Sequence, residues 1–301
     1  MKSGATTLNN KHAYLIMAHN HPDLLNRLLN ILDDPRNDVF VHIDSKSSDA
    51  FVQQVRKSLT NANLFFTERI DVHWGAFSLV QAEMALLKLA TDTGNYAYYH
   101  LISGVDLPIK TQNQIHNFFD SIQGQELVQF QQPKISAEKL ERVRRYFPMQ
   151  EKDIRNNQLL SFSQRVLVKA QKILGMDRLK HVSTDFQMGS NWFSITDDFA
   201  RYIIRVLPKY VPYFRKSFCS DELIVQTILI NSPFKGRLYH AQFDDSKQGN
   251  MRFIVWINHA PRDIVGSDYQ ALKSSDLLFA RKFNPDKDLA IIEKVITEMA
   301  Q

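Results

Sequence analysis

Three polar side chains stand just after short apolar runs, and these are the first positions at which we expect chemistry. They are His19 after His12–Ala18, Asp44 after Val39–Ile43, and Asp106 in the turn after Tyr96–Ile102. Apolar runs of this length predict strands, and open parallel sheets bind ligands beyond the carboxyl ends of their strands. A carboxylate there accepts hydrogen bonds from a nucleobase N–H or ribose hydroxyls, or, for Asp44, caps the following turn. These residues predict a nucleotide-like ligand but do not name a reaction.

A second acidic group is Ser220-Asp221-Glu222. These residues fit the first turn of a helix, where Ser or Asp caps the backbone and acids face the helix dipole. The adjacent Cys219 is the single cysteine, so an internal disulfide is excluded and a reducing compartment fits. No His partner for Cys219 is identifiable, and an inert thiol is favoured over a nucleophile.

The sequence lacks the usual signals for cofactor and metal binding. The loop His19-Asn20-His21-Pro22 is not the Gly-rich turn of a dinucleotide site, and no P-loop occurs. No further Cys/His cluster accompanies His19 and His21, so a structural or substrate-contacting role is favoured over zinc. The literal Asp-x-Asp, Asp286-Lys287-Asp288, follows a proline and predicts a helix start rather than a metal site.

The elements that must position these residues alternate along the chain. Strand-like runs at 12–18, 39–43 and 63–66 are separated by helical patterns that begin at Pro22 and cover Phe51–Leu59. Further helices are expected over Phe77–Thr91, Gln112–Ile122, Ser136–Lys172, around Asp198–Leu207 and around Asp221–Asn231, and further strands over Tyr96–Ile102, Glu126–Phe130, Trp192–Ile195 and Phe253–Trp256. This alternation predicts an α/β fold with a mostly parallel central sheet flanked by helices. No linker-like segment divides the 301 residues, so we expect one domain over 12–301 after a disordered or loosely attached N-terminus at 1–11.

The charge of the chain is uneven. The net charge is +5 and the sequence pI about 9.1, and basic residues gather in a segment at 134–180. They are Lys134, Lys139, Arg142, Arg144, Arg145, Lys152, Arg155, Arg165, Lys169, Lys172, Arg178 and Lys180. Either a solvated helical face or attachment to an anionic membrane surface explains this segment. Nucleic acid is not expected, because no nucleic-acid-binding signature accompanies the charge.

The sequence also bears on where the protein acts. Residues 1–11 are polar and contain no apolar core of a signal peptide. No apolar run approaches the roughly 20 residues needed to cross a bilayer. We expect a cytoplasmic protein, with peripheral attachment to the inner face of the plasma membrane as the alternative.

Seven segments, taken in order, resemble one known family. They are AHNHPD (Ala18–Asp23), VHIDSKS (Val41–Ser47), VHWGAFSLVQAE (Val72–Glu83), LISGVDLPIKT (Leu101–Thr111), GSNWF (Gly189–Phe193), SDE (Ser220–Glu222) and LFARKF (Leu278–Phe283). Each is weak alone, whereas the ordered set, over roughly 12–290, resembles the core-2/I-branching enzymes. This is glycosyltransferase family 14, of β-1,6-N-acetylglucosaminyltransferases and peptide O-xylosyltransferases. The resemblance implies a GT-A-type fold, a UDP-sugar donor and inversion at the transferred sugar.

Residue roles follow from the resemblance. It implies that Ala18, His19, Asp44 and Arg69 bind the donor nucleotide in a half at about 12–130. The acceptor and catalytic half is then about 131–301. Asp106 and Lys110 face the cleft between donor and acceptor, as do Ser190, Asn191 and Trp192, although a structural role for the Asp106 turn is equally expected.

The resemblance makes Glu222 the catalytic base, with Asp221 as its competitor. In the xylosyltransferase branch the base lies in the element that here contains Asn191, so this departure favours Glu222. Arg281 and Lys282 would meet the leaving diphosphate in place of a metal, together with Arg262 or His259, where the alignment is uncertain. A solvated basic pair is the alternative for Arg281 and Lys282.

The resemblance also implies that the acceptor contacts Trp256, Glu141, Arg144, Arg145 and Tyr146. This fits their chemistry, since aromatic faces stack on sugars and charged groups bond their hydroxyls.

The function expected from the resemblance is transfer of a sugar, with N-acetylglucosamine the first candidate, to form a β-linkage in envelope or surface polysaccharide assembly by a bacterial-type member. The acceptor is a glycan, free or lipid-linked, and no metal or other cofactor is expected. The alternatives are a xylosyl- or other hexosyltransferase of the same family and, in another class, a non-catalytic basic protein that docks on anionic lipid or nucleic acid.

Overall fold

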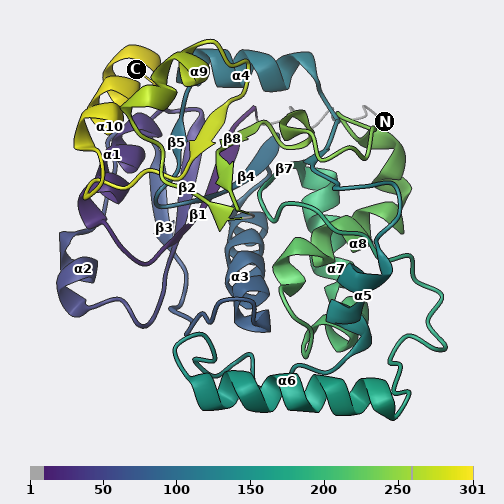
Figure 1. Ribbon diagram of the computed structural model, residues 1–301. Helices are drawn as coiled ribbons and strands as arrows, with labels where there is room; N and C mark the ends of the chain where they lie inside the picture. The colour runs from purple at the N-terminus through teal and green to yellow at the C-terminus, as the bar shows by residue number, and fades with distance from the viewer. Residues whose placement is uncertain (1–9, 259, 301) are drawn as a thin grey trace, which may run out of the picture.

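The centre of the molecule is a six-stranded sheet. The structure, a computed structural model, describes residues 10–258 and 260–300. The strand order is β3-β2-β1-β4-β7-β6 (Figure 1), and the strands are β1 (His12–Ala18), β2 (Asn37–Ile43), β3 (Asn63–Phe66), β4 (Tyr98–Ser103), β6 (Leu127–Val128) and β7 (Phe193–Thr196). The pairs β1–β2, β1–β4 and β2–β3 are parallel, while β7 is antiparallel to both neighbours. The expected α/β fold, with a mostly parallel central sheet, is confirmed.

Helices cover both faces of the sheet because successive residues of each strand point to opposite sides. Tyr14 and Ile16 of β1 belong to one buried cluster, whereas Ala13 and Leu15 belong to the other. The first cluster is covered by α1 (Pro22–Ile31), α2 (Asp49–Gln54), α4 (Gln112–Ser121), α9 (Tyr269–Lys273), α10 (Leu289–Val295) and η5 (Ile296–Ala300). The second is covered by α3 (Phe77–Thr93), α7 (Asp197–Phe214) and α8 (Ile224–Ile230).

Short elements build up one end of the sheet. A three-stranded sheet has the order β5-β11-β8, and β9 and β10 form a separate pair. These strands are β5 (Leu107–Pro108), β8 (Arg252–Ile254), β9 (Trp256–Ile257), β10 (Ala260–Pro261) and β11 (Phe279–Arg281), with the short helices η1 (Ser220–Glu222), η2 (Pro233–Arg237), η3 (Lys247–Gly249) and η4 (Gly266–Asp268) between elements. The prediction of one strand over Phe253–Trp256 is wrong, because the chain leaves β8 after Ile254 and pairs again as β9 with β10.

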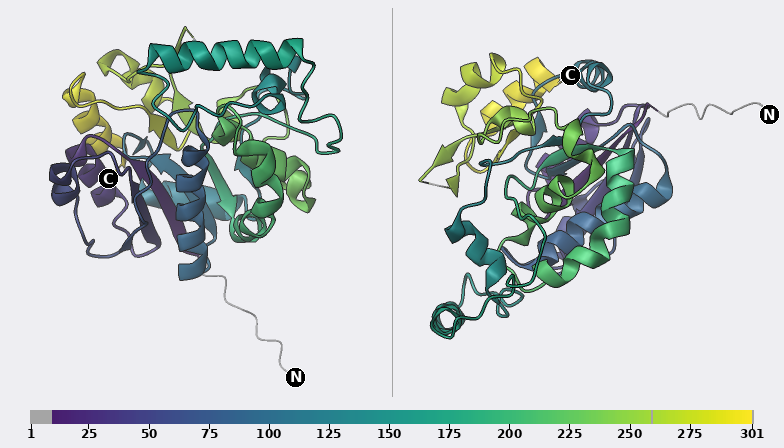
Figure 2. Two further views of the ribbon diagram at one scale, coloured as in Figure 1. Left: turned by 90° about the horizontal axis from the view of Figure 1, so that it is seen from below. Right: turned by 90° about the vertical axis from the view of Figure 1, so that its right-hand side faces the viewer.

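Two helical predictions need correction. The expected helix Phe51–Leu59 ends at Gln54, because Val55 adopts an extended backbone and buries its side chain in the core. The helix-prone segment Ser136–Lys172 is two helices, α5 (Ala137–Arg144) and α6 (Gln158–Ile173), with irregular chain between them. Figure 2 shows α6 at the outer edge of the molecule.

The expected loose N-terminus at 1–11 lies largely outside the described residues. Lys11, which is described, forms an ion pair with Asp38 at 3.1 Å.

Candidate active site

The loops after β1, β2 and β4 meet at one edge of the sheet, as the positions of His19, Asp44 and Asp106 predicted. The backbone N–H of Asp44 donates to the carbonyl of Ala18 over 2.9 Å. The hydroxyl of Ser47 donates to the carbonyl of His19 over 3.0 Å. The N–H of Gly104 donates to Met17 over 2.8 Å, which joins the third loop to the first.

The loop after β2 is held by Asp44 within it and by Arg69, which follows β3. Asp44 is buried and accepts the backbone N–H of Lys46 over 2.9 Å, so the turn-capping role is present. The guanidinium of Arg69 donates to the carbonyls of Asp44 and Ser45, each over 3.0 Å. Burial lowers the pKa of His19, although the adjacent Asp44 carboxylate acts in the opposite direction. Arg69 therefore shapes the loop that would receive a nucleotide.

Arg281 joins three of the segments that carry the family resemblance. Its Nε donates to the Oδ1 of Asp106 over 3.2 Å, and its guanidinium lies 4.1 Å from the ring centre of Trp192. Asp106 is fully buried and accepts both the backbone N–H and the hydroxyl of Ser103. Asp106 thus has the structural role expected for its turn, and it also orients a cation.

Lys282 extends this positive charge toward the first loop. Its Nζ lies 3.6 Å from Asp263, and its charge contributes to the lowered pKa of His19. Arg281 is therefore not merely solvated, whereas the side chain of Lys282 is 41% exposed and forms its ion pair with Asp263.

Glu222 lies where the remaining segments meet. Its Oε2 accepts a hydrogen bond from the guanidinium of Arg142 over 2.6 Å, and about a third of its side chain (36%) is exposed. Its carbonyl accepts the N–H of Gly189 over 2.9 Å, and the N–H of Cys219 donates to Gly75 over 2.8 Å. The backbone around Glu222 is thus fastened to the segments 72–83 and 189–193.

Two glycines, Gly75 and Gly189, allow these segments to approach one another closely. Gly75 has φ +72°, a left-handed conformation that favours glycine. At Gly189 a Cβ would lie 1.8 Å from the carbonyl oxygen of Gln129, so no side chain fits there.

A buried acid pair lies behind Glu222. Burial, and then the charge of Asp221, raise the pKa of Glu83 well above its usual range. Burial, and then Glu222, raise the pKa of Asp221 to about 7. Asn191 donates to Oε1 of Glu83 over 3.2 Å, while Oε2 of Glu83 and Oδ1 of Asp221 have no hydrogen-bond partner among the described residues. These surroundings favour protonated carboxyls, so Glu222, rather than its competitor Asp221, is the carboxylate that an acceptor could reach.

Cys219 has no feature of a nucleophile. The thiol is buried, and burial raises its pKa.

Several predicted site residues are engaged elsewhere. Lys110 donates to the carbonyl of Ser275 over 2.7 Å, and Arg262 forms an ion pair with Asp268 over 2.5 Å. His259 lies outside the described residues. The expected contact of Arg262 with a diphosphate stays a prediction, and it would require exchange of this ion pair.

Most of the predicted acceptor residues lie on α5 or directly after it. Glu141 pairs with Arg144 over 3.1 Å and with Arg145 over 3.0 Å. The Tyr146 ring lies under Arg178, 4.4 Å from its guanidinium, while Trp256 is exposed on β9. None of these contacts reaches Glu222, so their acceptor role stays a prediction.

Arg142 and Glu83 were not predicted from the sequence to be site residues. Glu141, Arg144 and Arg145 are spaced to share one face of a helix, which leaves Arg142 on another face. That spacing was the available signal that Arg142 has a different partner. Glu83 lies in Val72–Glu83, one of the segments that carry the family resemblance. Only its burial in the structure distinguishes it as a site residue.

Two cavities of the structure lie elsewhere. One of about 350 Å³ lies between α6 and Phe147, and one of about 300 Å³ lies beside α1 and Asp286. Neither is lined by Glu222, Asp44 or Asp106. We place the candidate site by the convergence of its segments instead. Among residues 10–258 and 260–300, no group of three His, Cys, Asp or Glu side chains is arranged to hold a metal ion.

The chain is similar to several known proteins. The family model "Branch: Core-2/I-Branching enzyme" matches residues 12–271. The human "Beta-1,3-galactosyl-O-glycosyl-glycoprotein beta-1,6-N-acetylglucosaminyltransferase" is 23% identical, over 93% of this chain and 68% of its own length. The human "N-acetyllactosaminide beta-1,6-N-acetylglucosaminyl-transferase" is 24% identical, over 90% of this chain and 67% of its own length. Among solved structures, mouse xyloside xylosyltransferase 1 covers 89% of this chain and 96% of its own, with 11% identity and a TM-score of 0.38.

Proposed function

Because the chain belongs to the core-2/I-branching enzyme family, and is therefore a glycosyltransferase, we propose that it transfers N-acetylglucosamine from a UDP-linked donor to a glycan hydroxyl with inversion, forming a β-linkage. The proposal includes a role in surface polysaccharide assembly. The names of the human relatives support the choice of sugar. The observation that carries the proposal is Glu222, partly exposed, paired with Arg142 and bound through its backbone to the Gly189 segment.

In the proposed reaction Glu222 acts as general base. Its carboxylate takes the proton of the acceptor hydroxyl while that oxygen attacks the anomeric carbon. The bond from the anomeric carbon to the diphosphate breaks, and its electron pair leaves with UDP. Arg142 fixes the direction of the carboxylate, since its guanidinium holds Oε2 and leaves Oε1 for the acceptor.

The leaving diphosphate gains negative charge, which a cation stabilises in a water-poor site. We assign this to Arg281 and Lys282, because both lie at the sheet edge that also carries the loops of Ala18, His19 and Asp44. Turnover is accordingly expected to persist in EDTA. Loss of turnover in EDTA and its recovery with manganese would contradict this assignment and direct attention to Asp44 and Asp106 as ligands.

The test is release of UDP from UDP-N-acetylglucosamine, measured with and without β-galactoside acceptors. Acceptor-dependent release, with product linkage read by NMR, is expected. The same assay is run with UDP-xylose, UDP-glucose and UDP-galactose. If one of these donors is turned over faster, the chain is a xylosyl- or other hexosyltransferase of the same family. The proposed function would be contradicted if no donor and acceptor gave UDP release and calorimetry detected no UDP binding. The alternative of a non-catalytic basic protein would then be favoured.

A further inference from the structure

Helix α6 presents apolar side chains to solvent. Leu159 is 78% exposed, Phe162 60%, Val166 50% and Ile173 76%. Their spacing of three, four and seven residues places them on one side of the helix. Half of the large hydrophobic side chains that are exposed in the described residues lie between 159 and 176. Isolated exposed hydrophobics need no explanation, but a continuous patch marks an interaction surface.

The side of α6 that faces the protein is polar instead. Gln164 accepts the N–H of Met149 over 3.1 Å, and Gln171 accepts the N–H of Tyr146 over 2.8 Å and donates to its carbonyl over 2.9 Å. No residue of α6 belongs to either buried apolar cluster of the described residues. The usual amphipathic order of a surface helix is thus reversed.

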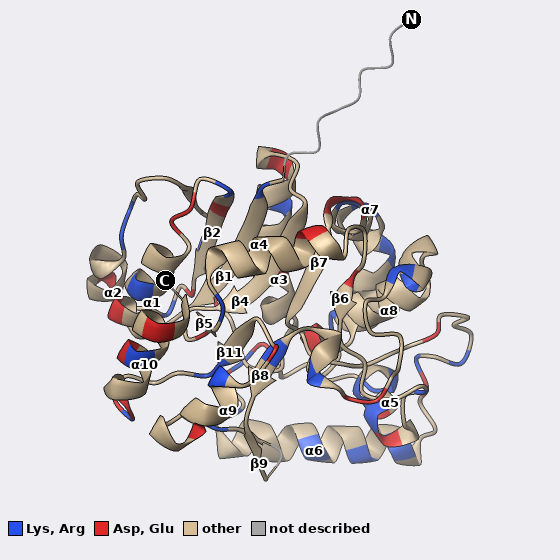
Figure 3. Cartoon of the chain, turned by 90° about the horizontal axis from the view of Figure 1, so that it is seen from above, with Lys and Arg blue, Asp and Glu red and all other residues tan. Residues whose placement is uncertain are grey.

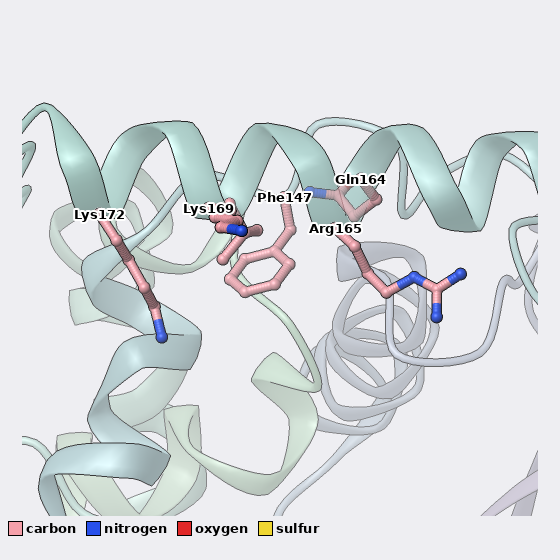
Figure 4. A pocket seen from close by; sticks show the side chains of 6 residues that line it. Phe147, Gln164, Arg165, Lys169 and Lys172 are labelled. Carbon is pink, nitrogen blue, oxygen red and sulfur yellow. The ribbon is translucent and has the colours of Figure 1, made fainter.

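Basic side chains border the exposed apolar stripe. Arg165, Lys169 and Lys172 lie along one side of α6, where they line a cavity with Phe147 (Figure 4). Arg165 and Lys169 form no ion pair among the described residues, while Lys172 lies 3.5 Å from Glu141. The helix contains no acidic residue, and its Lys and Arg bands are visible in Figure 3.

We propose that α6 docks on an anionic lipid surface. Its stripe of Leu159, Phe162, Val166 and Ile173 would enter the boundary between headgroups and acyl chains, while Arg165 and Lys169 bind headgroup phosphates. Charge favours lipid over a second copy of the chain, because a second α6 would bring basic residues and no acid to the contact. No helix in the described part of the chain could span a membrane, so this contact would be peripheral.

The position of α6 relates this surface to the candidate site. Helix α5 contains Arg142, and the segment that joins α5 to α6 contains Glu151. The carboxylate of Glu151 accepts the first two backbone N–H groups of α3 over 2.9 and 3.2 Å. In the same segment Arg155 lies 4.7 Å from the ring centre of Trp74, next to Gly75. Docking would therefore hold the Glu222 site near lipid, where it could meet a lipid-linked acceptor. That last step rests on the proposed function, whereas docking itself does not.

The test is flotation of the purified chain with vesicles of phosphatidylcholine, alone or mixed with phosphatidylglycerol, at low and high salt. Binding is expected only to the anionic vesicles and should fall with salt, because the headgroup charges are screened. The variant Phe162→Ser/Ile173→Ser should weaken binding about tenfold or more through lost apolar burial. Arg165→Gln/Lys169→Gln should weaken it and reduce its salt dependence. The matched control is Phe66→Ser/Leu289→Ser, two exposed apolar residues outside α6, which should bind as wild type.

Three results would overturn the proposal: no vesicle binding by the wild type, equal binding by the α6 variants, or a dimer that is lost in Phe162→Ser/Ile173→Ser without any lipid binding. The last result would instead assign the stripe to contact between copies. Circular dichroism confirms that each variant is folded. UDP release on a soluble acceptor is measured in parallel, so that failure of docking is distinguished from failure of the proposed transfer.

Discussion

At the scale of single residues, Asp221 and Glu222 are neighbours whose carboxyls have opposite surroundings. Asp221 is turned into the protein, where burial and Glu222 raise its pKa to about 7. Glu222 is turned outward and meets a guanidinium. A general base must lie within reach of its proton donor, so the proposed base role suits the partly exposed Glu222 better than the buried Asp221.

Glu222→Gln should remove most transferase activity. An amide of nearly the same shape cannot accept the acceptor proton, so kcat is expected to fall by about 10²–10⁴, while the affinity for UDP, measured by calorimetry, stays close to wild type. Glu138→Gln, an exposed position on α5, serves as control and should keep its rate. Near-normal turnover by Glu222→Gln would exclude it as base.

Glu83→Gln should change how stability depends on pH. Because the folded chain raises the pKa of Glu83, the unfolded chain releases this proton first as pH rises above about 4.3. The free energy of unfolding of the wild type therefore falls as pH rises from there toward the folded pKa. Glutamine does not titrate, so the variant should gain stability relative to wild type between pH 5 and pH 8 in urea unfolding. If the difference in free energy of unfolding between the two proteins stays constant with pH, the raised pKa of Glu83 is contradicted.

At the scale of elements, the site depends on loops that fit closely because small residues permit it. The chain before β7 passes Gln129 so closely that Gly189 has no room for a side chain. The same glycine donates its N–H to Glu222. The position of the loop that contains Glu222 is thus coupled to the edge of the sheet.

Gly189→Ala should move this loop. Its methyl group would overlap the Gln129 carbonyl, and overpacking of this kind costs about 1–3 kcal/mol. We expect a lower urea midpoint and reduced kcat. Gly236→Ala is the control, because no atom lies within 4 Å of the added Cβ; it should be near neutral. Equal stability of the two variants would show that the loop absorbs a side chain.

At the scale of the whole molecule, buried histidines join β1, β4 and α4. His12 and His100 share a hydrogen bond of 3.0 Å, and His116 stacks on His12 with ring centres 4.0 Å apart. Burial lowers the pKa of all three, for His116 to about 4. Below about pH 6.5 there is therefore a pH range in which these histidines are neutral in the folded protein but protonated in the unfolded chain.

The free energy of unfolding should consequently fall as pH drops below about 6.5, where the unfolded histidines gain protons first. For His116 this loss continues down to its folded pKa of about 4. His116→Gln should reduce the loss between pH 7 and pH 4 by roughly 2–3 kcal/mol, at about 1.4 kcal/mol per pKa unit. His181→Gln, at an exposed position, is the control in the same urea series. An unchanged pH dependence in His116→Gln would refute this account.

The sequence by itself determined the alternation of elements and the edge of the sheet at which chemistry is expected. Apolar runs such as His12–Ala18 specify buried strands through their local composition. The polar residues at the ends of these strands come together because parallel strands end at the same edge of a sheet. The ordered segments were enough to indicate the family. Local pattern was not enough for α2 or β8, whose ends depend on the core contact of Val55 and on pairing with distant β11.

Only the tertiary structure decided which charges face one another. Arg142 and Glu222 are eighty residues apart, and Asp106 and Arg281 are 175 apart, so no local spacing could pair them. Ionic and hydrogen-bonding energies depend on distance and on burial, and both are set when separate segments pack. For the same reason, only packing showed that the apolar side chains of α6, among them Leu159, Phe162 and Ile173, are left in solvent.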